Sequence, residues 1–310
     1  MRTPLVVGVV GPTATGKSDL ALDLAEALGG EVVGADASQL YRGMDIGTAK
    51  VPPAERRGIP HHQLDVIDVV AEASVAAYQV AARADLAAIQ GRGRHPILAG
   101  GSGLYVRAAL DVLEIPPTDP EVRSRLEREA EEVGPAVLGT RLRDLDPAAA
   151  AAIEPGNTRR IVRALEVIEL TGRPFSATMP TRTSLQPTVV LGLRMPRAVL
   201  DERVATRVRR MWAQGLLDEV RHLETLGLRR GRTASRALGY AQALAELDGT
   251  MTTEQAQDET TALTRRLVRR QESWFNPDPR ITWLDALAPN LAEQAVEVVQ
   301  AAISDNGAHG

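Results

Sequence analysis

The chain has 310 residues, of which 44% are hydrophobic and 25% charged, so it can bury one large core or two modest ones. It contains no cysteine, which excludes disulfides and thiolate chemistry. Its formal net charge of -4 argues against indiscriminate nucleic-acid binding by the whole surface. No stretch approaches the roughly 18 apolar residues of a membrane span, and no export signal is visible. We therefore expect a cytoplasmic protein with no membrane partner.

Strand and helix patterns alternate in the first third of the chain. Residues 4–10 form a valine-rich apolar run that predicts a strand, and residues 18–30 have the leucine spacing of a helix. Residues 31–38 predict a second strand, residues 74–89 a long helix, and residues 95–103 a third strand that ends in glycines. This alternation predicts a parallel sheet with helices on both faces, which binds ligands at the carboxyl ends of its strands.

The pattern changes after the proline-rich segment IPPTDP. Residues 115–187 read as helices interrupted by glycine and proline, and residues 188–195 as a strand that returns to the sheet. We therefore predict an α/β core domain, formed by residues 1–114 and 188–310, that carries a helical insertion domain. The remainder after residue 197 reads as mostly helix, with a frayed tail over residues 304–310.

The segment GPTATGKS matches the phosphate-loop spacing G-x-x-x-x-G-K-[ST] between a predicted strand and a predicted helix. Its glycines let backbone N–H groups close around an anion, and the helix that follows adds the positive end of its dipole. Lys17 supplies a full charge, and the Ser18 hydroxyl is a candidate Mg²⁺ ligand. The predicted phosphate-binding residues are Gly11, Pro12, Thr13, Ala14, Thr15, Gly16, Lys17 and Ser18. The motif between a strand and a helix predicts a P-loop NTPase-like core. The motif alone does not specify which phosphate compound binds.

Other polar residues follow the strands. Asp36, at the end of the second strand, is placed at the edge of the same cleft, although a turn-forming aspartate is the alternative. In DIGTAK, Asp45 is a candidate indirect Mg²⁺ ligand and Lys50, one of only two lysines, a second phosphate contact; either is also open to a structural role. Ser102, in the second glycine-rich turn GGSGLY, faces the same cleft or belongs to a plain tight turn.

Two further features concern metals and polyanions. His61 and His62 are adjacent, so their side chains diverge, and we assign them to structural hydrogen bonds rather than to a metal. Arginines cluster over residues 203–236 and again over residues 265–270. A solvated face is the ordinary explanation of one such cluster, but two in one half of the chain favour a polyanionic partner.

The sequence segments described above, with several others, occur in an order that is found in a known protein family. The order of these segments is that of bacterial tRNA dimethylallyltransferases, the delta(2)-isopentenylpyrophosphate transferases, and the sequence resembles that family over roughly residues 5–285. The segments are GPTATGKS, DASQLYRGMDIGTAK, HHQLDV, GGSGLY, NTRRIVRALEV, the stretch from RVRRM to GLLDEV, LGY and RRQESWF. The resemblance implies transfer of a dimethylallyl group from dimethylallyl diphosphate, with Mg²⁺, to the exocyclic amine of the adenine 3′ to the anticodon. This base is position 37 of tRNAs that read codons beginning with U, and the product is N6-dimethylallyladenosine.

The same resemblance implies roles for single residues. Asp36 is then the base that orients the amine and takes its proton, Thr13 a partner of the diphosphate, and Arg207 the leaving-group arginine. The predicted partners are dimethylallyl diphosphate and the tRNA anticodon stem-loop, and we expect a monomer. The predicted tRNA contacts are Asp36, Ala37, Ser38, Gln39, Ser102, Arg123, Arg159, Arg160 and Arg163. For the three arginines of NTRRIVRALEV, a solvated helix face remains the alternative.

Three other functions remain open from the residues alone. A small-molecule kinase would use the same loop and an aspartate at the second strand. A transferase that prenylates free adenine nucleotides would not need the basic insertion, and a nucleotide-dependent RNA-binding switch would not need a base at position 36.

Overall fold

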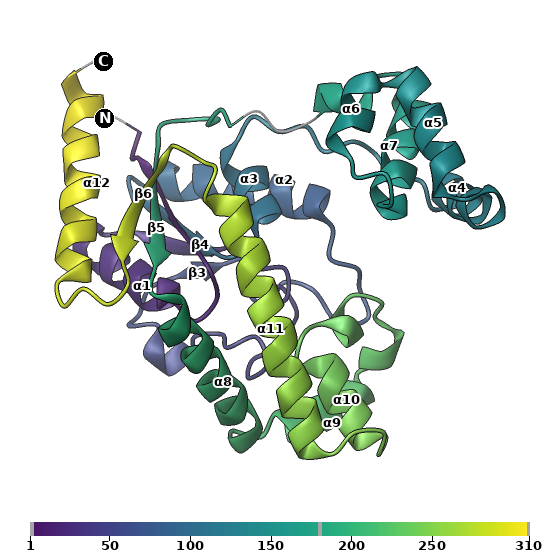
Figure 1. Cartoon of the computed structure of the whole chain (residues 1–310). Coiled ribbons are helices and arrows are strands. Elements are labelled where there is room, and N and C mark those ends of the chain that lie inside the picture. Colours follow the sequence, from purple (N-terminus) through teal and green to yellow (C-terminus); the bar gives the residue numbers. More distant parts are fainter. Residues whose placement is uncertain (1–2, 179–181, 309–310) are drawn as a thin grey trace. The chain divides into compact units, whose positions relative to one another are not determined.

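A six-stranded parallel sheet forms the centre of the computed structural model, which describes residues 3–178 and 182–308 (Figure 1). The strand order is β3-β2-β4-β1-β5-β6, and every neighbouring pair is parallel. The strands are β1 (Val6–Val10), β2 (Glu31–Gly34), β3 (His61–His62), β4 (Pro96–Gly100), β5 (Thr188–Arg194) and β6 (Ile281–Asp285). The predicted α/β fold with a parallel sheet is therefore confirmed.

Strand β1 lies at the middle of the sheet, between β4 and β5, and all five of its residues are buried. Its central Gly8 is in register with Leu98 of β4 and Val190 of β5. A strand covered on both faces has no solvent side, which is why this segment reads as a continuous apolar run rather than an alternating one.

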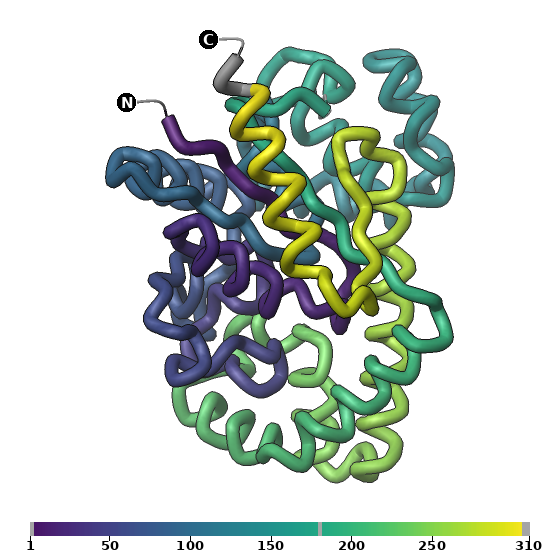
Figure 2. The backbone as a smooth tube through the Cα atoms, turned by 90° about the vertical axis from the view of Figure 1, so that its left-hand side faces the viewer, coloured from purple at the N-terminus to yellow at the C-terminus, as the bar shows by residue number. Residues whose placement is uncertain are grey.

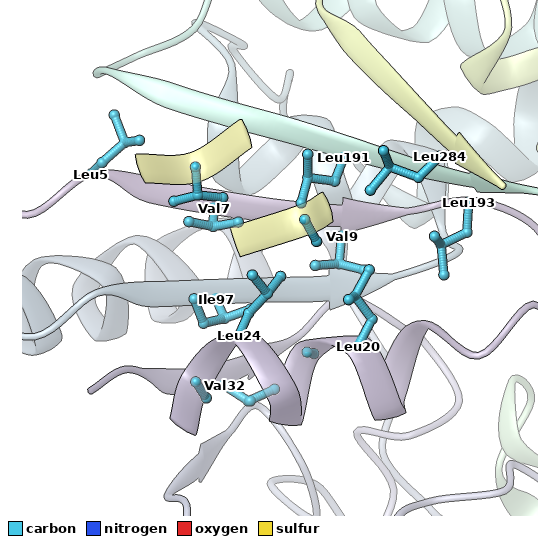
Figure 3. Packing of buried hydrophobic residues seen from close by; sticks show 14 residues of the cluster. Leu5, Val7, Val9, Leu20, Leu24, Val32, Ile97, Leu191, Leu193 and Leu284 are labelled. Atoms are coloured by element: carbon cyan, nitrogen blue, oxygen red, sulfur yellow. The ribbon is translucent and has the colours of Figure 1, made fainter. Parts of the chain in front are cut away.

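Helices cover both faces of the sheet, as the alternating pattern predicted. Helices α1 (Lys17–Leu28) and α12 (Leu291–Ala308) pack on each other and on one face, and both Figure 1 and Figure 2 show them side by side. Helices α2 (Val75–Gly91) and α3 (Gly103–Leu110) pack against β2 and β4 and against each other. Figure 3 shows the core of the first face, where Leu20 and Leu24 of α1 lie against the side chains of the central strands.

Four more helices follow β5 in the same compact unit. They are α8 (Arg197–Ala213), α9 (Leu216–Thr225), α10 (Tyr240–Leu247) and α11 (Thr253–Phe275). A second apolar cluster joins Leu216 and Val220 of α9 and Tyr240 of α10 to Tyr41 and Met44 of the loop after β2. Helix α11 packs against α8. The long loop that carries DIGTAK is thus anchored on the C-terminal helices.

The chain divides into two compact units, residues 1–110 with 184–310 and residues 111–183. The predicted boundaries, at 114/115 and 187/188, each lie four residues later. The second unit contains the helices α4 (Pro120–Val133), α5 (Pro135–Leu145), α6 (Pro147–Ala152) and α7 (Thr158–Thr171). Leu126, Leu138, Leu142 and Leu165 are among the buried residues of its own apolar core.

Two strands and the end of the chain differ from the prediction. Strand β3 has only two residues, too few to show a pattern, and β6 lies in a stretch that was read as mostly helix. The predicted tail from Ser304 is wrong as far as Ala308, because α12 continues to that residue. Ala295 and Val299 of this helix are fully buried against the sheet. This packing stabilises a helical end that the local sequence did not predict.

Within residues 3–178 and 182–308, no helix combines the length and the apolar character that a bilayer crossing requires.

Replacing Leu24 by alanine tests the core below the phosphate loop. Leu24 is completely buried, so Leu24→Ala should lower the free energy of unfolding by about 2–5 kcal/mol, measured from the urea unfolding midpoint. Glu26→Ala, on the same helix but in an exposed ion pair with Arg57, should cost less than about 1 kcal/mol. Equal effects of the two changes would contradict this account of the core.

Candidate active site

The phosphate loop connects the end of β1 to the start of α1 and has an unusual backbone. Gly11, Ala14 and Gly16 have φ values of 135°, 67° and 90°, which lie in the region that L side chains rarely adopt. A Cβ on Gly11 would also lie 2.6 Å from the carbonyl oxygen of Leu193, so only glycine fits there. The turn aims the first N–H groups of α1, which have no intrahelical acceptor, at the space in front of the helix. An anion is the natural ligand of such an arrangement.

Two half-buried cations are close enough to repel each other at this loop. Lys17 folds back and donates a hydrogen bond from Nζ to the Pro12 carbonyl at 2.6 Å. Burial, and then the charge of Arg207, lower the pKa of Lys17 to about 7, while Asp36 acts in the opposite direction. Burial likewise lowers the pKa of Arg207, and Asp36 again opposes the shift. Both cations would gain from a bound anion.

A cavity of about 1100 Å³ lies beside these cations. Arg203, Arg207 and Arg210, spaced four and three residues apart on one face of α8, line it together with Lys17. Acidic side chains, including Glu202 and Glu55, also line it. The apolar part of its lining consists of Ala14, Ile46, Ala49, Val51, Pro52, Pro53, Val199 and Met211. The cavity therefore offers a ligand both positive charge and apolar surface.

Asp36 follows β2, and its loop meets the turn that follows β4. Its Oδ1 accepts a hydrogen bond from the Ser38 N–H at 2.9 Å, so the turn-forming role that was left as the alternative is present. The Ser102 hydroxyl accepts a bond from the Ala37 N–H at 3.4 Å, and the Ser102 N–H donates to the Ala35 carbonyl at 3.3 Å. Because β2, β4 and β1 are neighbours in the sheet, the loops of Asp36, Ser102 and Lys17 leave the same edge. The carboxylate of Asp36 thus acts electrostatically on Lys17 and Arg207.

The Thr48 carbonyl joins two predicted site residues that are distant in sequence. It accepts hydrogen bonds from Nε2 of Gln39 at 3.1 Å and from Nη2 of Arg207 at 3.3 Å. The rest of the DIGTAK loop is held by Glu219 of α9, whose carboxylate accepts the N–H groups of Asp45 and Ile46 at 3.1 and 2.7 Å. Glu219 is not among the predicted site residues, although it lies in GLLDEV, one of the segments that carry the resemblance.

Lys50 has a structural role in place of the expected phosphate contact. Its side chain is 2% exposed, and its ammonium donates to the Tyr41 carbonyl at 2.6 Å, to Asp45 at 2.9 Å and to Asp65. All three ammonium hydrogens are therefore used by partners in this loop and in the loop after β3. Asp45, the candidate indirect Mg²⁺ ligand, is the partner of this lysine.

Gln271 of α11 is a site residue that the sequence analysis missed. It is buried, and its side-chain amide accepts a bond from the Thr13 N–H at 2.9 Å and donates one to the Gly101 carbonyl at 3.0 Å. Its place in the RRQESWF segment was visible in the sequence. Its target loops were not, because 258 residues separate Gln271 from Thr13.

The adjacent histidines make structural hydrogen bonds, as predicted. His61 uses Nδ1 to contact the Ile59 carbonyl at 2.8 Å, and His62 uses Nε2 to contact buried Glu31 at 2.7 Å. Among the described residues there is no group of three or more His, Cys, Asp or Glu side chains that could hold a metal ion.

In the helical unit, two of the predicted tRNA contacts are engaged with buried Glu166. Arg123 and Arg163 each donate to its carboxylate at 2.8 Å, and Arg163 also binds the carbonyls of Pro116 and Pro117. Burial would raise the pKa of Glu166, but these arginines and the Asp119 N–H hold it below the usual value. Arg159 and Arg160, by contrast, are exposed on α7.

The fold and this loop define a P-loop-containing α/β protein with a helical insertion. Residues 39–278, more than half of the chain, match the model of the IPP transferase family. The chain belongs to that family.

Curated relatives and solved structures agree with this assignment. The chain is 61% identical to the tRNA dimethylallyltransferase of Kineococcus radiotolerans, over 91% of this chain and 90% of that one, and 60% identical to that of Streptomyces avermitilis, over 94% and 93%. Its structure is similar to the tRNA isopentenylpyrophosphate transferase of Bacillus halodurans, with a TM-score of 0.71, 39% identity and coverage of 97% and 96%. A eukaryotic dimethylallyltransferase acting on tRNA has a TM-score of 0.84, 27% identity and coverage of 97% and 80%.

The lowered pKa of Lys17 predicts proton uptake when an anion binds. Near pH 8, above the Lys17 pKa of about 7, the free amine is largely neutral, and a bound anion raises its pKa. Binding of inorganic diphosphate should therefore take up about one proton more in the wild type than in Lys17→Arg, which is always charged. Calorimetry in buffers of different ionisation enthalpy measures the number of protons taken up by each protein. Protons that diphosphate itself gains or loses are the same for both proteins, so they cancel in the difference. Equal proton counts would contradict the shift.

Proposed function

We propose that this chain transfers a dimethylallyl group from dimethylallyl diphosphate to the exocyclic amine of adenine 37, 3′ to the anticodon, in tRNAs that read codons beginning with U. The product is N6-dimethylallyladenosine. Membership of the IPP transferase family and about 60% identity to tRNA dimethylallyltransferases support the reaction class. A monomer suffices for this proposal, because every residue that it uses lies in one chain, and a cytoplasmic location goes with a tRNA substrate.

The observation that carries the proposal is the cavity beside Lys17 and Arg207. A prenyl diphosphate has a charged end and an apolar end, and the lining of the cavity includes both cations and apolar side chains such as Ile46 and Met211. Among the described residues, both cations line this cavity, whereas Asp36 does not. The carboxylate is instead beside them, held in the turn that follows β2. Donor and acceptor then approach the cations from different sides.

Departure of the diphosphate is the step that the cations favour. Breaking the allylic carbon–oxygen bond places negative charge on the leaving group. Lys17, Arg207 and the N–H groups at the start of α1 stabilise that charge as it develops. Because both cations are partly desolvated before the donor binds, they gain more from the leaving group than exposed cations would. Thr13, in the loop itself, is the further diphosphate partner in this proposal.

Asp36 is the group that takes the proton. The adenine amine is a poor nucleophile, because its lone pair is delocalised into the ring. When nitrogen forms the new bond to the allylic carbon, it must lose a proton, and the Asp36 carboxylate accepts it. Lys17 and Arg207 lie near enough to this carboxylate to interact with it electrostatically.

Mg²⁺ fits this loop as a companion of the diphosphate rather than as a resident of a protein cage. The described residues offer no three-ligand cluster, and the Ser18 hydroxyl is exposed in the first turn of α1. Mg²⁺ is commonly held by one or two protein oxygens together with substrate phosphates and water. Ser18 would supply the protein oxygen, and the bound ion would neutralise charge on the leaving group.

The target adenine must leave its stack to reach Asp36, at a cost of a few kcal/mol. Ala37, Ser38, Gln39 and Ser102 surround Asp36 in two adjoining loops and are the proposed contacts to the flipped nucleotide. Recognition of an unpaired, extruded base is the usual way in which proteins read RNA sequence.

The reaction is tested by incubating the protein with Mg²⁺ and radiolabelled dimethylallyl diphosphate, with unmodified tRNA or AMP in parallel. Label in tRNA alone is the expected result. Label in AMP would favour a nucleotide transferase, and no label in either would overturn the proposal in favour of a kinase-type use of the loop, to be examined with ATP and hydroxyl acceptors.

Asp36→Asn should lower the rate of transfer by about 100- to 10,000-fold without weakening tRNA binding. The amide oxygen can still accept the Ser38 N–H bond, so the turn persists while the base is lost. Single-turnover transfer and filter binding measure the two quantities. Asp68→Asn, which alters an exposed carboxylate paired with Arg42, is the control. Wild-type turnover in Asp36→Asn would remove it from the chemistry.

Arg159→Ala combined with Arg160→Ala should weaken tRNA binding and reduce the slope of log K against log salt by about one to two units. Both side chains are exposed and available to phosphates. Arg141→Ala, in an exposed pair with Glu129 in the same unit, should leave the slope unchanged. Arg163→Ala should instead lower the thermal stability of the helical unit, because it removes a partner of buried Glu166. An unchanged salt slope in the double variant would assign Arg159 and Arg160 to a solvated face.

A further inference from the structure

The amide of Gln271 connects two loops that leave different strands. Its Oε1 accepts the N–H of Thr13 in the loop after β1, and its Nε2 donates to the carbonyl of Gly101 in the turn after β4. The side chain is buried, so these two bonds form away from competing water. Both hydrogen-bonding ends of the amide are therefore committed to loops of the site.

The turn after β4 is bonded in its own right to the loop of Asp36. The Ser102 N–H donates to the Ala35 carbonyl, and the Ser102 hydroxyl accepts the Ala37 N–H. Hydrogen bonds thus connect Thr13 to Gln271 and Gln271 to Gly101. The next residue along the chain, Ser102, is bonded to Ala35 and Ala37, the two residues that flank Asp36. These contacts link the phosphate loop to the proposed base without passing through a substrate.

Helix α11 contacts this turn so closely that the turn has little freedom to move. A Cβ on Gly101 would collide with Nε2 of Gln271, and a Cβ on Gly103 would collide with the indole of Trp274, one helical turn later. Helix α11 is in turn fixed by fully buried Val268, which packs with Leu200 and Val204 of α8. Displacing Gln271 would therefore displace the turn.

We propose that Gln271 is a positioning residue that sets the distance between the cradle of the leaving diphosphate and Asp36. This inference rests on the proposed function. Group transfer between two bound reactants depends steeply on their alignment, and a misplacement of about 1 Å can cost about 100-fold in rate. The amide touches neither reactant in this account and acts through Thr13 and Gly101.

Misalignment has a chemical signature of its own. If the allylic carbon–oxygen bond breaks while the amine is out of reach, water supplies the nucleophilic oxygen. The new carbon–oxygen bond forms, the added water loses a proton, and the products are dimethylallyl alcohol and diphosphate. The ratio of this alcohol to prenylated tRNA reports alignment. It does not depend on how much of the protein is folded, since both products come from the same active molecules.

The test measures both products from labelled dimethylallyl diphosphate and unmodified tRNA with the full chain, Gln271→Met and Gln271→Glu. Methionine keeps much of the side-chain volume but removes both hydrogen bonds. Glutamate keeps an acceptor for the Thr13 N–H but sets an oxygen against the Gly101 carbonyl. We expect both variants to lower transfer by about 100-fold and to raise the ratio of alcohol to prenylated tRNA by about 10-fold. Ser273→Ala, an exposed neighbour on α11, should retain the wild-type ratio.

A purely structural role for Gln271 would lower both products together, so a wild-type ratio in both variants would overturn the inference. A changed ratio in Ser273→Ala as well would also overturn it, because the effect would then belong to the helix rather than to the amide. The wild-type reaction distinguishes failure of the proposed function from failure of the positioning role of Gln271. Label in tRNA supports the proposed function and leaves Gln271 to be judged by the ratio, whereas no transfer by the wild type overturns the function and this inference with it.

Discussion

The burial of two neighbouring cations, Lys17 and Arg207, is the constraint on which the rest of the site depends. The two cations are close and partly desolvated, and the pKa of each is lowered, with Asp36 as the carboxylate that opposes the shift. Keeping both groups charged costs free energy until an anion binds between the P-loop and the basic face of α8. The strained backbone of the loop, the stripe of arginines on α8 and the Thr48 carbonyl that holds Arg207 all keep the two charges where that anion can meet them.

The order of the strands explains why a phosphate cradle and a carboxylate come together. The chain forms β1, β2 and then β4, but β4 lies between the other two in the sheet. The turn after β4 therefore separates the P-loop from Asp36, and it is bonded to both, through Gln271 on one side and through Ser102 on the other. A prenyl donor and a base need such a spacer, because the reacting carbon lies between the leaving diphosphate and the amine.

Residues of one chemical type have different roles according to their neighbours. Lys17 and Lys50 are the two lysines of the chain, yet only Lys17 lies where a charge is left for a ligand, since Lys50 donates to Tyr41, Asp45 and Asp65. Arg123 and Arg163 hold buried Glu166, while exposed Arg159 and Arg160 lie on the same helix as Arg163. Burial and pairing, rather than the number of charges in a segment, decide which cations are available.

The sequence by itself determined the P-loop, the parallel α/β fold and the family, because each depends on local patterns: glycines at a tight turn, a lysine before a helix, alternating strands and helices, and motifs in a set order. It also placed Asp36 at a strand end. The tertiary structure alone decided which polar groups meet. Thr13 and Gln271 are 258 residues apart, Gln39 and Arg207 share the carbonyl of Thr48, and Glu219 holds the DIGTAK loop from another helix. Hydrogen bonds and charge shifts act over a few ångströms in space, and local sequence patterns do not encode which distant segments the folded core brings within that range.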